Sequence, residues 1–145
     1  MQLTTKGRYA VTAMLDLASN DSTRPVTLDM ISQRQNISLS YLEQLFAKLR
    51  KASLVKSIRG PGGGYVLNVN PVDVTLTEII EAVDENIDLR RCHGSKNCLR
   101  GKQCLSHHLW CEVSDQIRGF LSSRNLQQVM DDYYTNQDIK VKLTV

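Results

Sequence analysis

Hydrophobic residues recur every three or four positions in three successive stretches near the start of the chain, and this spacing places them on one face of an α-helix. We predict a first helix over residues 4–19 and a second, short helix that begins at Thr27 and runs through Arg34. A third helix follows, with Ser38 or Ser40 as its N-cap and its apolar residues at three- and four-residue spacing. The tight connection between the second and third helices indicates a helix-turn-helix.

The pattern then changes to two short strand-like segments, residues 54–59 and 65–68. Between them lies the run Gly60-Pro61-Gly62-Gly63-Gly64, whose backbone can adopt positive φ and form the tip of a hairpin. Such a run is often only a turn, and no Gly-Lys-Ser/Thr follows it as in a nucleotide phosphate loop. A helix-turn-helix followed by a hairpin predicts a mainly α fold of the winged helix-turn-helix type, with the hairpin as its wing.

Two further helices are predicted after the hairpin. One is capped by Thr75, and a longer one starts near Cys104 or Leu105. The longer helix carries an apolar stripe made of Trp110, Val113, Ile117, Phe120 and Leu121. The stripe packs either on its own domain or on a second subunit across a two-fold axis. We favour dimerisation because three helices already cover the small core of the first half.

Composition adds that the chain is an ordinary globular protein, with 41% hydrophobic and 23% charged residues. No apolar stretch is long enough to span a bilayer, and the N-terminus lacks the apolar segment of a secretion signal. We therefore expect a cytoplasmic protein without a membrane partner.

The net charge of +3 is unevenly distributed. Residues 34–60 contain six basic side chains and one acidic side chain, whereas residues 73–88 contain six acidic side chains and no basic one. This distribution indicates a polyanionic partner for the basic segment, or simply two solvated faces of opposite sign. Charge alone does not decide between these interpretations.

Candidate metal ligands are concentrated in one glycine-containing stretch, where Cys92, Cys98 and Cys104 follow one another with five residues between each pair. In a reducing compartment such cysteines indicate metal binding or redox chemistry rather than disulfides. Structural zinc sites usually take cysteines in close pairs, so the wider spacing favours an iron–sulfur cluster over zinc or a thiol redox switch. The spacing leaves the fourth ligand open among His93, His107, His108 and Cys111, although a lone helical cysteine is more often a small core residue.

The third helix and the hairpin are the predicted DNA contacts. Residues near the start of the helix would face the major groove, where Gln can read adenine and Glu can accept from cytosine: Ser38, Ser40, Tyr41, Glu43 and Gln44. Basic residues further along the helix are placed for phosphates: Lys48, Arg50 and Lys51. At the hairpin tip, Arg59 and Pro61 would enter the minor groove.

Glu43 is the unexpected member of this set, because a carboxylate beside phosphates opposes binding unless it finds a donor. It could tune selectivity among DNA sites. The alternative is that Ser40 and Glu43 form a capping box, a purely structural role.

Taken together, these residues resemble the Rrf2 family of winged-helix regulators, and in particular its iron–sulfur cluster regulators. The matching segments are residues 3–16 (LTTKGRYAVTAMLD), 37–46 (ISLSYLEQLF), 59–65 (RGPGGGY) and 82–85 (AVDE), followed by Cys92, Cys98, Cys104 and His107. The resemblance covers nearly all of the chain except the tail.

The resemblance implies a homodimeric transcription factor that binds promoter DNA and is not an enzyme. It implies a [2Fe-2S] cluster held by Cys92, Cys98, Cys104 and His107 and supplied by the iron–sulfur assembly machinery, whose genes the protein controls. It also implies a second class of DNA site, bound without the cluster, and Glu43 as the residue that discriminates between the classes.

Three regions are expected on this basis. Residues 1–72 form the winged helix-turn-helix DNA-binding region, residues 73–108 the connecting helix and cluster-binding loop, and residues 109–145 the dimerisation helix and tail. From Asn125 on, the pattern predicts only a weak helix through Met130, after which periodicity is lost.

The remaining alternatives are a nitric oxide or oxygen sensor of the same family and a zinc-stabilised DNA-binding regulator. An enzyme of thiol redox chemistry is disfavoured because the chain has no Cys-x-x-Cys pair.

Overall fold

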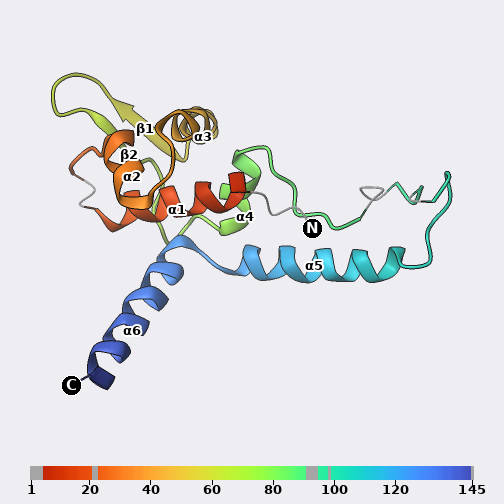
Figure 1. The fold of residues 1–145 in the computed structure, drawn as a ribbon. Coiled ribbons are helices and arrows are strands. Elements are labelled where there is room, and N and C mark those ends of the chain that lie inside the picture. Colours follow the sequence, from red (N-terminus) through yellow and green to blue (C-terminus); the bar gives the residue numbers. More distant parts are fainter. Residues whose placement is uncertain (1–4, 21–22, 91–94, 98, 145) are drawn as a thin grey trace.

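The computed structural model describes residues 5–20, 23–90, 95–97 and 99–144. Figure 1 shows a head built from the first four helices and a hairpin, with the long helix α5 extending from it as an arm and α6 leaving in another direction. In chain order the elements are α1 (Thr5–Ser19), α2 (Leu28–Gln35), α3 (Leu39–Lys51), β1 (Val55–Ile58), β2 (Gly64–Leu67), α4 (Leu76–Ala82), α5 (His107–Ser123) and α6 (Leu126–Thr144). The predicted mainly α, winged helix-turn-helix fold is confirmed.

Both helices of the helix-turn-helix begin at a side-chain cap. Thr27 accepts a hydrogen bond from the N–H of Met30, and Ser38 accepts one from the N–H of Tyr41, each at 3.2 Å. Asn36 ends α2 in the left-handed conformation at φ 53°, which asparagine tolerates better than most residues. Local sequence signals therefore define the turn that leads into α3.

The hairpin is joined to the head by a backbone bridge. β1 and β2 pair antiparallel with Val55 opposite Leu67, and Val26 exchanges two backbone hydrogen bonds with Tyr65, at 2.9 and 2.8 Å. A β-carbon at Gly64 would lie 2.6 Å from the carbonyl oxygen of Val26, so only glycine permits this approach. The bridge thus fixes β2 to the head near the turn end of the strands, while the tip beyond it stands clear of the head (Figure 1).

The core lies between the helices of the head and the β1–β2 hairpin. The largest side chains that are less than 2% exposed are Phe46, Met14, Ile31, Leu42, Leu45, Leu49, Ile79, Ile80, Leu126, Val55, Val74 and Val83. Phe46 of α3 also meets Tyr65 of β2 edge to face, with ring centroids 4.9 Å apart. This packing holds α3 at a fixed angle to the hairpin.

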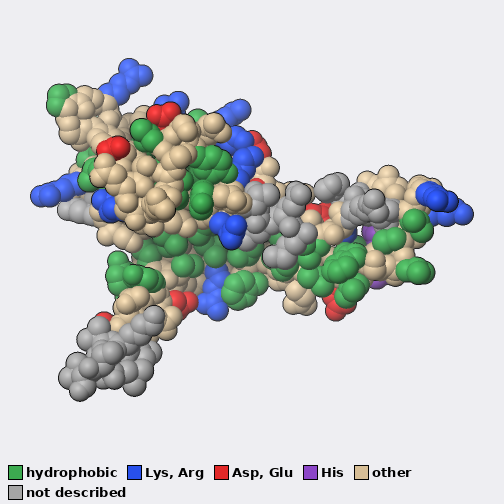
Figure 2. Space-filling view, viewed as in Figure 1, with side chains coloured by type: hydrophobic (Ala, Val, Ile, Leu, Met, Phe, Trp, Pro, Cys, Tyr) green, Lys and Arg blue, Asp and Glu red, His purple; other side chains and the backbone are tan. Residues whose placement is uncertain are grey.

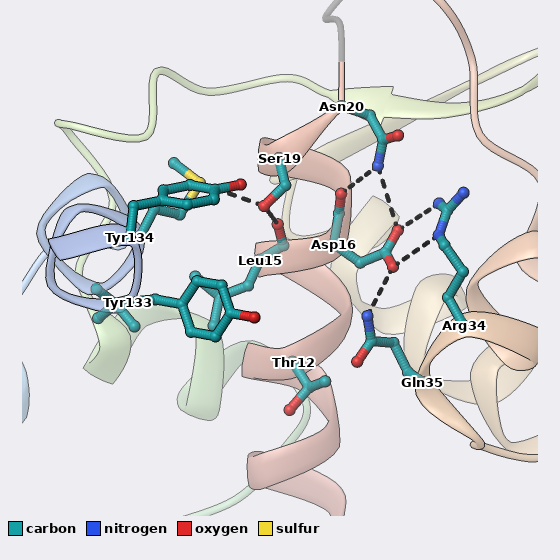
Figure 3. Close-up of a pocket in the computed structure, with 11 residues that line it drawn as sticks. Thr12, Leu15, Asp16, Ser19, Asn20, Arg34, Gln35, Tyr133 and Tyr134 are labelled. Carbon is teal, nitrogen blue, oxygen red and sulfur yellow. Dashed lines mark hydrogen bonds and ion pairs between the residues drawn. The ribbon is translucent and has the colours of Figure 1, made fainter. Parts of the chain in front are cut away.

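A buried carboxylate fastens α2 to α1. The side chain of Asp16 is only 3% exposed and accepts hydrogen bonds from Nε and Nη2 of Arg34, at 3.1 and 2.6 Å, and from Nε2 of Gln35, at 2.9 Å. Figure 3 shows these groups converging on Asp16 at one wall of a cavity of about 470 Å³, with Tyr133 and Tyr134 of α6 on the opposite side. The charge-assisted bonds compensate for burial of the carboxylate and set the position of α2.

The tail differs from the sequence-based expectation. α6 is one continuous helix, so the predicted weak helix through Val129 and Met130 is present and extends well beyond the point where the apolar periodicity is lost. Asn125 and Gln128 cap its start reciprocally, with Oδ1 of Asn125 accepting from the N–H of Gln128 at 2.8 Å, and Leu126 anchors it in the core. Residues 131–138 are all exposed, which explains the missing apolar period. Neither α6 nor any other described helix is long and apolar enough to cross a bilayer.

We predict that Asp16→Asn lowers the free energy of unfolding by about 1–3 kcal/mol, because Arg34 loses a charged acceptor at a buried position. Urea denaturation followed by circular dichroism measures this change. The control is Asp131→Asn, whose exposed carboxylate accepts from Gln127, and it should change stability by less than about 0.5 kcal/mol. Equal effects of the two substitutions would contradict the role of Asp16.

Candidate nucleic-acid interface and cluster-ligand site

The polar face of α3 points to solvent. Of the predicted DNA contacts on or next to this helix, the exposed ones are Ser38, Ser40, Glu43, Gln44, Arg50 and Lys51, and the half-buried ones are Tyr41 and Lys48. Ser38 is also the N-cap, and the ring of Tyr41 packs edge to face on Tyr9 of α1 with centroids 5.8 Å apart. Ser38 and Tyr41 therefore support the helix as well as lying on its outer face.

The capping-box alternative for Glu43 is wrong. Because Ser38 is the N-cap, the third helical residue is Tyr41, and Ser40 lies within the first turn. The exposed carboxylate of Glu43 is thus presented to solvent on the same face as Gln44. A structural role as a cap no longer competes with a role in recognition.

The hairpin presents its tip to solvent beside this helix. Arg59 and Pro61 are both exposed, and Gly60 and Gly62 adopt φ of 96° and 74°, conformations that favour glycine. Figure 2 shows Lys and Arg side chains over the upper side of the head and near the hairpin tip. The head therefore carries positive charge on the elements that a winged helix uses to contact DNA.

One predicted phosphate contact already has an acidic partner. Nζ of Lys48 lies 3.0 Å from Oδ2 of Asp84, which directly follows α4 and its C-cap. The hydrogen bond to Asp84 raises the pKa of Lys48, and the same bond lowers the pKa of Asp84. Sequence analysis missed this pair, although the basic segment 34–60 and the acidic segment 73–88 meet here.

The described part of the ligand stretch, residues 95–97 and 99–107, lies at the far end of the α5 arm, away from the hairpin (Figure 1). Two predicted ligands, Cys92 and Cys98, lie outside the described residues. Cys104 is half-buried, and His107, the first residue of α5, is buried. Both line a cavity of about 280 Å³ whose other lining residues are Leu89, Arg90, Leu99, Ser106 and Trp110. The first residue of α5 is His107, whereas the sequence pattern predicted a start near Cys104 or Leu105.

The described donors fit a cluster or a thiophilic metal. A thiol and an imidazole that line one cavity are donors found in iron–sulfur and zinc sites. Within the described ranges, no three His, Cys, Asp or Glu side chains come close enough to hold a metal ion.

Cys111 lies beside this cavity and has polar neighbours. Its Sγ lies 3.4 Å from Nε2 of His107 and 3.9 Å from Nη1 of Arg90. Hydrogen bonding to Asp88, and to a lesser degree to Cys111, raises the pKa of Arg90. A permanent positive charge therefore stands next to the thiol and imidazole groups.

The residues of the predicted apolar stripe on α5 differ in their exposure to solvent. Trp110 and Phe120 are 41% and 57% exposed, whereas Val113 and Ile117 are half-buried and Leu121 packs against the core of the head. Figure 2 shows hydrophobic side chains along the arm. The apolar surface that faces solvent is thus real but narrower than the full stripe.

Sequence analysis also missed two exposed leucines at the start of the arm, Leu105 and Leu109. Leu109 lies one turn before Val113, so extending the three-four spacing backwards would have found it. The exposed apolar surface therefore reaches to the ligand end of α5.

A winged helix-turn-helix with a polar, solvent-facing recognition helix and a basic hairpin defines the class of DNA-binding transcription regulators. The chain belongs to the Rrf2 family, whose model, described as an iron-dependent transcriptional regulator, matches residues 3–132. Its relatives are named as transcriptional regulators, so the prediction that the protein is not an enzyme is confirmed.

Individual relatives place the chain among IscR-like regulators. It is 54% identical over 132 residues to the HTH-type transcriptional regulator IscR of Photorhabdus laumondii, covering 91% of this chain and 80% of the relative. It is 53% identical over 137 residues to IscR of Aliivibrio salmonicida, covering 94% and 82%. Among solved structures, T. potens IscR is similar with a TM-score of 0.75 at 37% identity, covering 92% of this chain and 88% of that one. CymR, the global cysteine regulator of B. subtilis, has a TM-score of 0.76 at 36% identity, covering 89% and 95%.

The cap assignment of α3 can be tested directly. Ser38→Ala should lower the free energy of unfolding by about 1 kcal/mol, because the N–H of Tyr41 loses its acceptor. Ser40→Ala, at an exposed position of the first turn, should change it by less than about 0.5 kcal/mol. Chemical denaturation of both variants makes the comparison, and a larger effect at Ser40 would contradict the assignment.

Proposed function

We propose that this protein is a homodimeric promoter-binding regulator that senses iron–sulfur cluster status. In this proposal it holds a [2Fe-2S] cluster through Cys92, Cys98, Cys104 and His107 and controls genes of iron–sulfur cluster assembly in the cytoplasm. The observation that carries the proposal is that Cys104 and His107 line one cavity at the end of an arm whose other end joins a DNA-binding head.

The head supplies the DNA reader. Exposed Gln44 is suited to adenine and exposed Glu43 to the amino group of cytosine, because their side chains offer the matching donors and acceptors in the major groove. Arg50 and Lys51 lie nearer the end of the helix, where they neutralise phosphates, and Arg59 at the hairpin tip enters the minor groove. Glu43 discriminates between site classes by rejecting positions that offer it no donor.

The arm supplies the dimer contact. Exposed Trp110 and Phe120, with half-buried Val113 and Ile117 between them, form an apolar surface that a second copy of α5 covers across a two-fold axis. Two recognition helices related by this axis then bind two half-sites separated by about one turn of DNA. Because the same helix begins with His107, ligand binding and dimer geometry act on one rigid element.

When bound, the cluster supplies iron and sulfide that tie the ligand stretch into one conformation. The chain's own contribution is to transmit that order. His107 fixes the first turn of α5, and Arg118, further along the helix, donates to Glu81 at 3.1 Å and to Asn86 at 2.8 Å. A shift of the arm relative to the head changes the spacing of the recognition helices, and so which half-sites fit.

The finer alternatives differ in the stimulus and the metal. A nitric oxide or oxygen sensor would hold the same kind of cluster and lose it to a different reagent, whereas a zinc-stabilised regulator would hold a colourless ion. The chain's similarity to the cysteine regulator CymR means that the fold by itself does not decide between stimuli. The donor set in the ligand stretch favours the cluster.

We predict that anaerobically purified protein is coloured and contains iron and sulfide in equal amounts. Cys104→Ala should abolish the visible absorption and the iron, because it removes a thiolate ligand. The matched control is Cys111→Ala, at another half-buried cysteine of the same region, and it should retain both. Absorption spectra with iron, sulfide and zinc analysis make the measurement, and colourless protein with one zinc per chain would contradict the cluster assignment.

The regulatory half of the proposal is tested with DNA. Cluster-loaded wild type and cluster-free Cys92→Ala protein should rank a panel of promoter fragments differently in fluorescence anisotropy titrations. Identical ranking and identical affinities would show that cluster status does not control site choice.

The dimer is tested on α5. Phe120→Asp places a carboxylate on the exposed apolar surface and should convert the dimer to monomers in sedimentation velocity, with weaker binding to two-half-site DNA. Gly119→Asp is the control. Open space surrounds Gly119, and the side-chain direction at this position lies about one quarter turn around the helix from that of Phe120. A Phe120→Asp protein that sediments as wild type does would exclude this surface as the interface.

A further inference from the structure

Asp84 occupies a strained but well-supported position. It lies at φ 60°, in the left-handed region that Asp and Asn tolerate better than other residues with side chains. Its N–H donates to the carbonyl of Glu81 at 3.0 Å, and the next N–H, of Glu85, donates to the carbonyl of Ile80 at 3.3 Å. The end of α4 therefore fixes the backbone that carries the carboxylate.

The residues after Asp84 are held between the head and the arm. We call residues 84–90 the linking segment. The buried carboxyl group of Glu85 lies against Gly7 of α1 and leaves no room there for a β-carbon. Asn86, two residues after Asp84, accepts a hydrogen bond from Arg118 of α5 at 2.8 Å. The linking segment thus contacts α1 of the head through Glu85 and α5 of the arm through Asn86.

The carboxylate of Asp84 faces the recognition helix. It pairs with Lys48 at 3.0 Å, and the charges of Lys6 and Lys51 also act on it and lower its pKa. The side chains of Lys48 and Asp84 are 36% and 73% exposed, so the pair adds little to stability. The ion pair therefore engages the charge of Lys48 but contributes little to the stability of the fold.

We propose that Asp84 is a positioning residue that holds Lys48 back from DNA phosphates and thereby limits the sequence-independent part of DNA affinity. The inference rests on the proposed function, because it requires α3 to contact DNA. Each phosphate contact adds affinity on every sequence, so withholding one cation per protomer keeps binding to unrelated DNA weak. The pair lies at the start of the linking segment, whose later residues Asn86 and Leu89 contact α5.

The test compares four proteins: wild type, Asp84→Asn, Lys48→Gln and the double variant. Asparagine keeps the size and tolerates φ 60°, so Asp84→Asn removes the charge without disturbing the backbone. Affinity for a labelled duplex of unrelated sequence is measured by anisotropy at several salt concentrations. Asp84→Asn should bind more tightly, with a slope of log K against log salt steeper by about 0.9 per protomer. Lys48→Gln should not bind more tightly than wild type, and adding Asp84→Asn to it should change neither affinity nor slope.

The control is Asp73→Asn, which removes one exposed acidic charge from the same acidic segment and should leave the slope unchanged. If Asp84→Asn acts as strongly in the Lys48→Gln background as in wild type, it works by direct repulsion of DNA and the inference is wrong. An unchanged slope in Asp84→Asn, with thermal melting as in wild type, also overturns it. Failure of wild type itself to bind any duplex would instead overturn the proposed function.

Discussion

The arrangement of the molecule depends on how α5 is joined to the head. Several polar contacts lie along that seam: Arg118 donates to Glu81 and Asn86, the hydroxyls of Thr77 and Ser122 lie 2.8 Å apart, and Ser114 accepts from the N–H of Leu89. Leu121 of α5 packs against the core of the head, and Val113 and Ile117 of the same helix are half-buried. Each polar, partly exposed contact stabilises the orientation of α5 by only a small amount, whereas the helices of the head are held by a close-packed core.

The contrast with the head is physical. Phe46, Leu42 and Leu49 of α3 are fully buried, and Asp16 ties α2 to α1 with charge-assisted bonds. Close packing of this kind has few alternative arrangements, so α3 and the hairpin move as one body. Any difference in geometry between two states is therefore concentrated at the seam and in the linking segment rather than within the DNA-binding head.

Local signals in the sequence were enough for most of the fold. Thr27 and Thr75 were predicted as caps and are caps, and the apolar periods of the first four helices became the buried faces. Two of the differences depend on residues distant in sequence. α6 has few apolar residues beyond Met130, and its start is stabilised by burial of Leu126 against the head. The pairing of Lys48 with Asp84 likewise joins segments 36 residues apart, and no local period reports it. Ser38 and Ser40 were equivalent as caps until the backbone geometry chose Ser38.

The position of the ligand donors at the tip of the arm follows the same logic. The fold is similar in T. potens IscR and in a protein described as a global cysteine regulator, so the fold alone does not determine what a regulator of this family responds to. A tenfold change in preference between two DNA sites requires only about 1.4 kcal/mol. Making or breaking one or two of the polar contacts at the seam is a free-energy change of about this size. Under the proposed function, a change at Cys104 and His107 would therefore need to rearrange only one or two of these contacts to alter which DNA sites the head prefers.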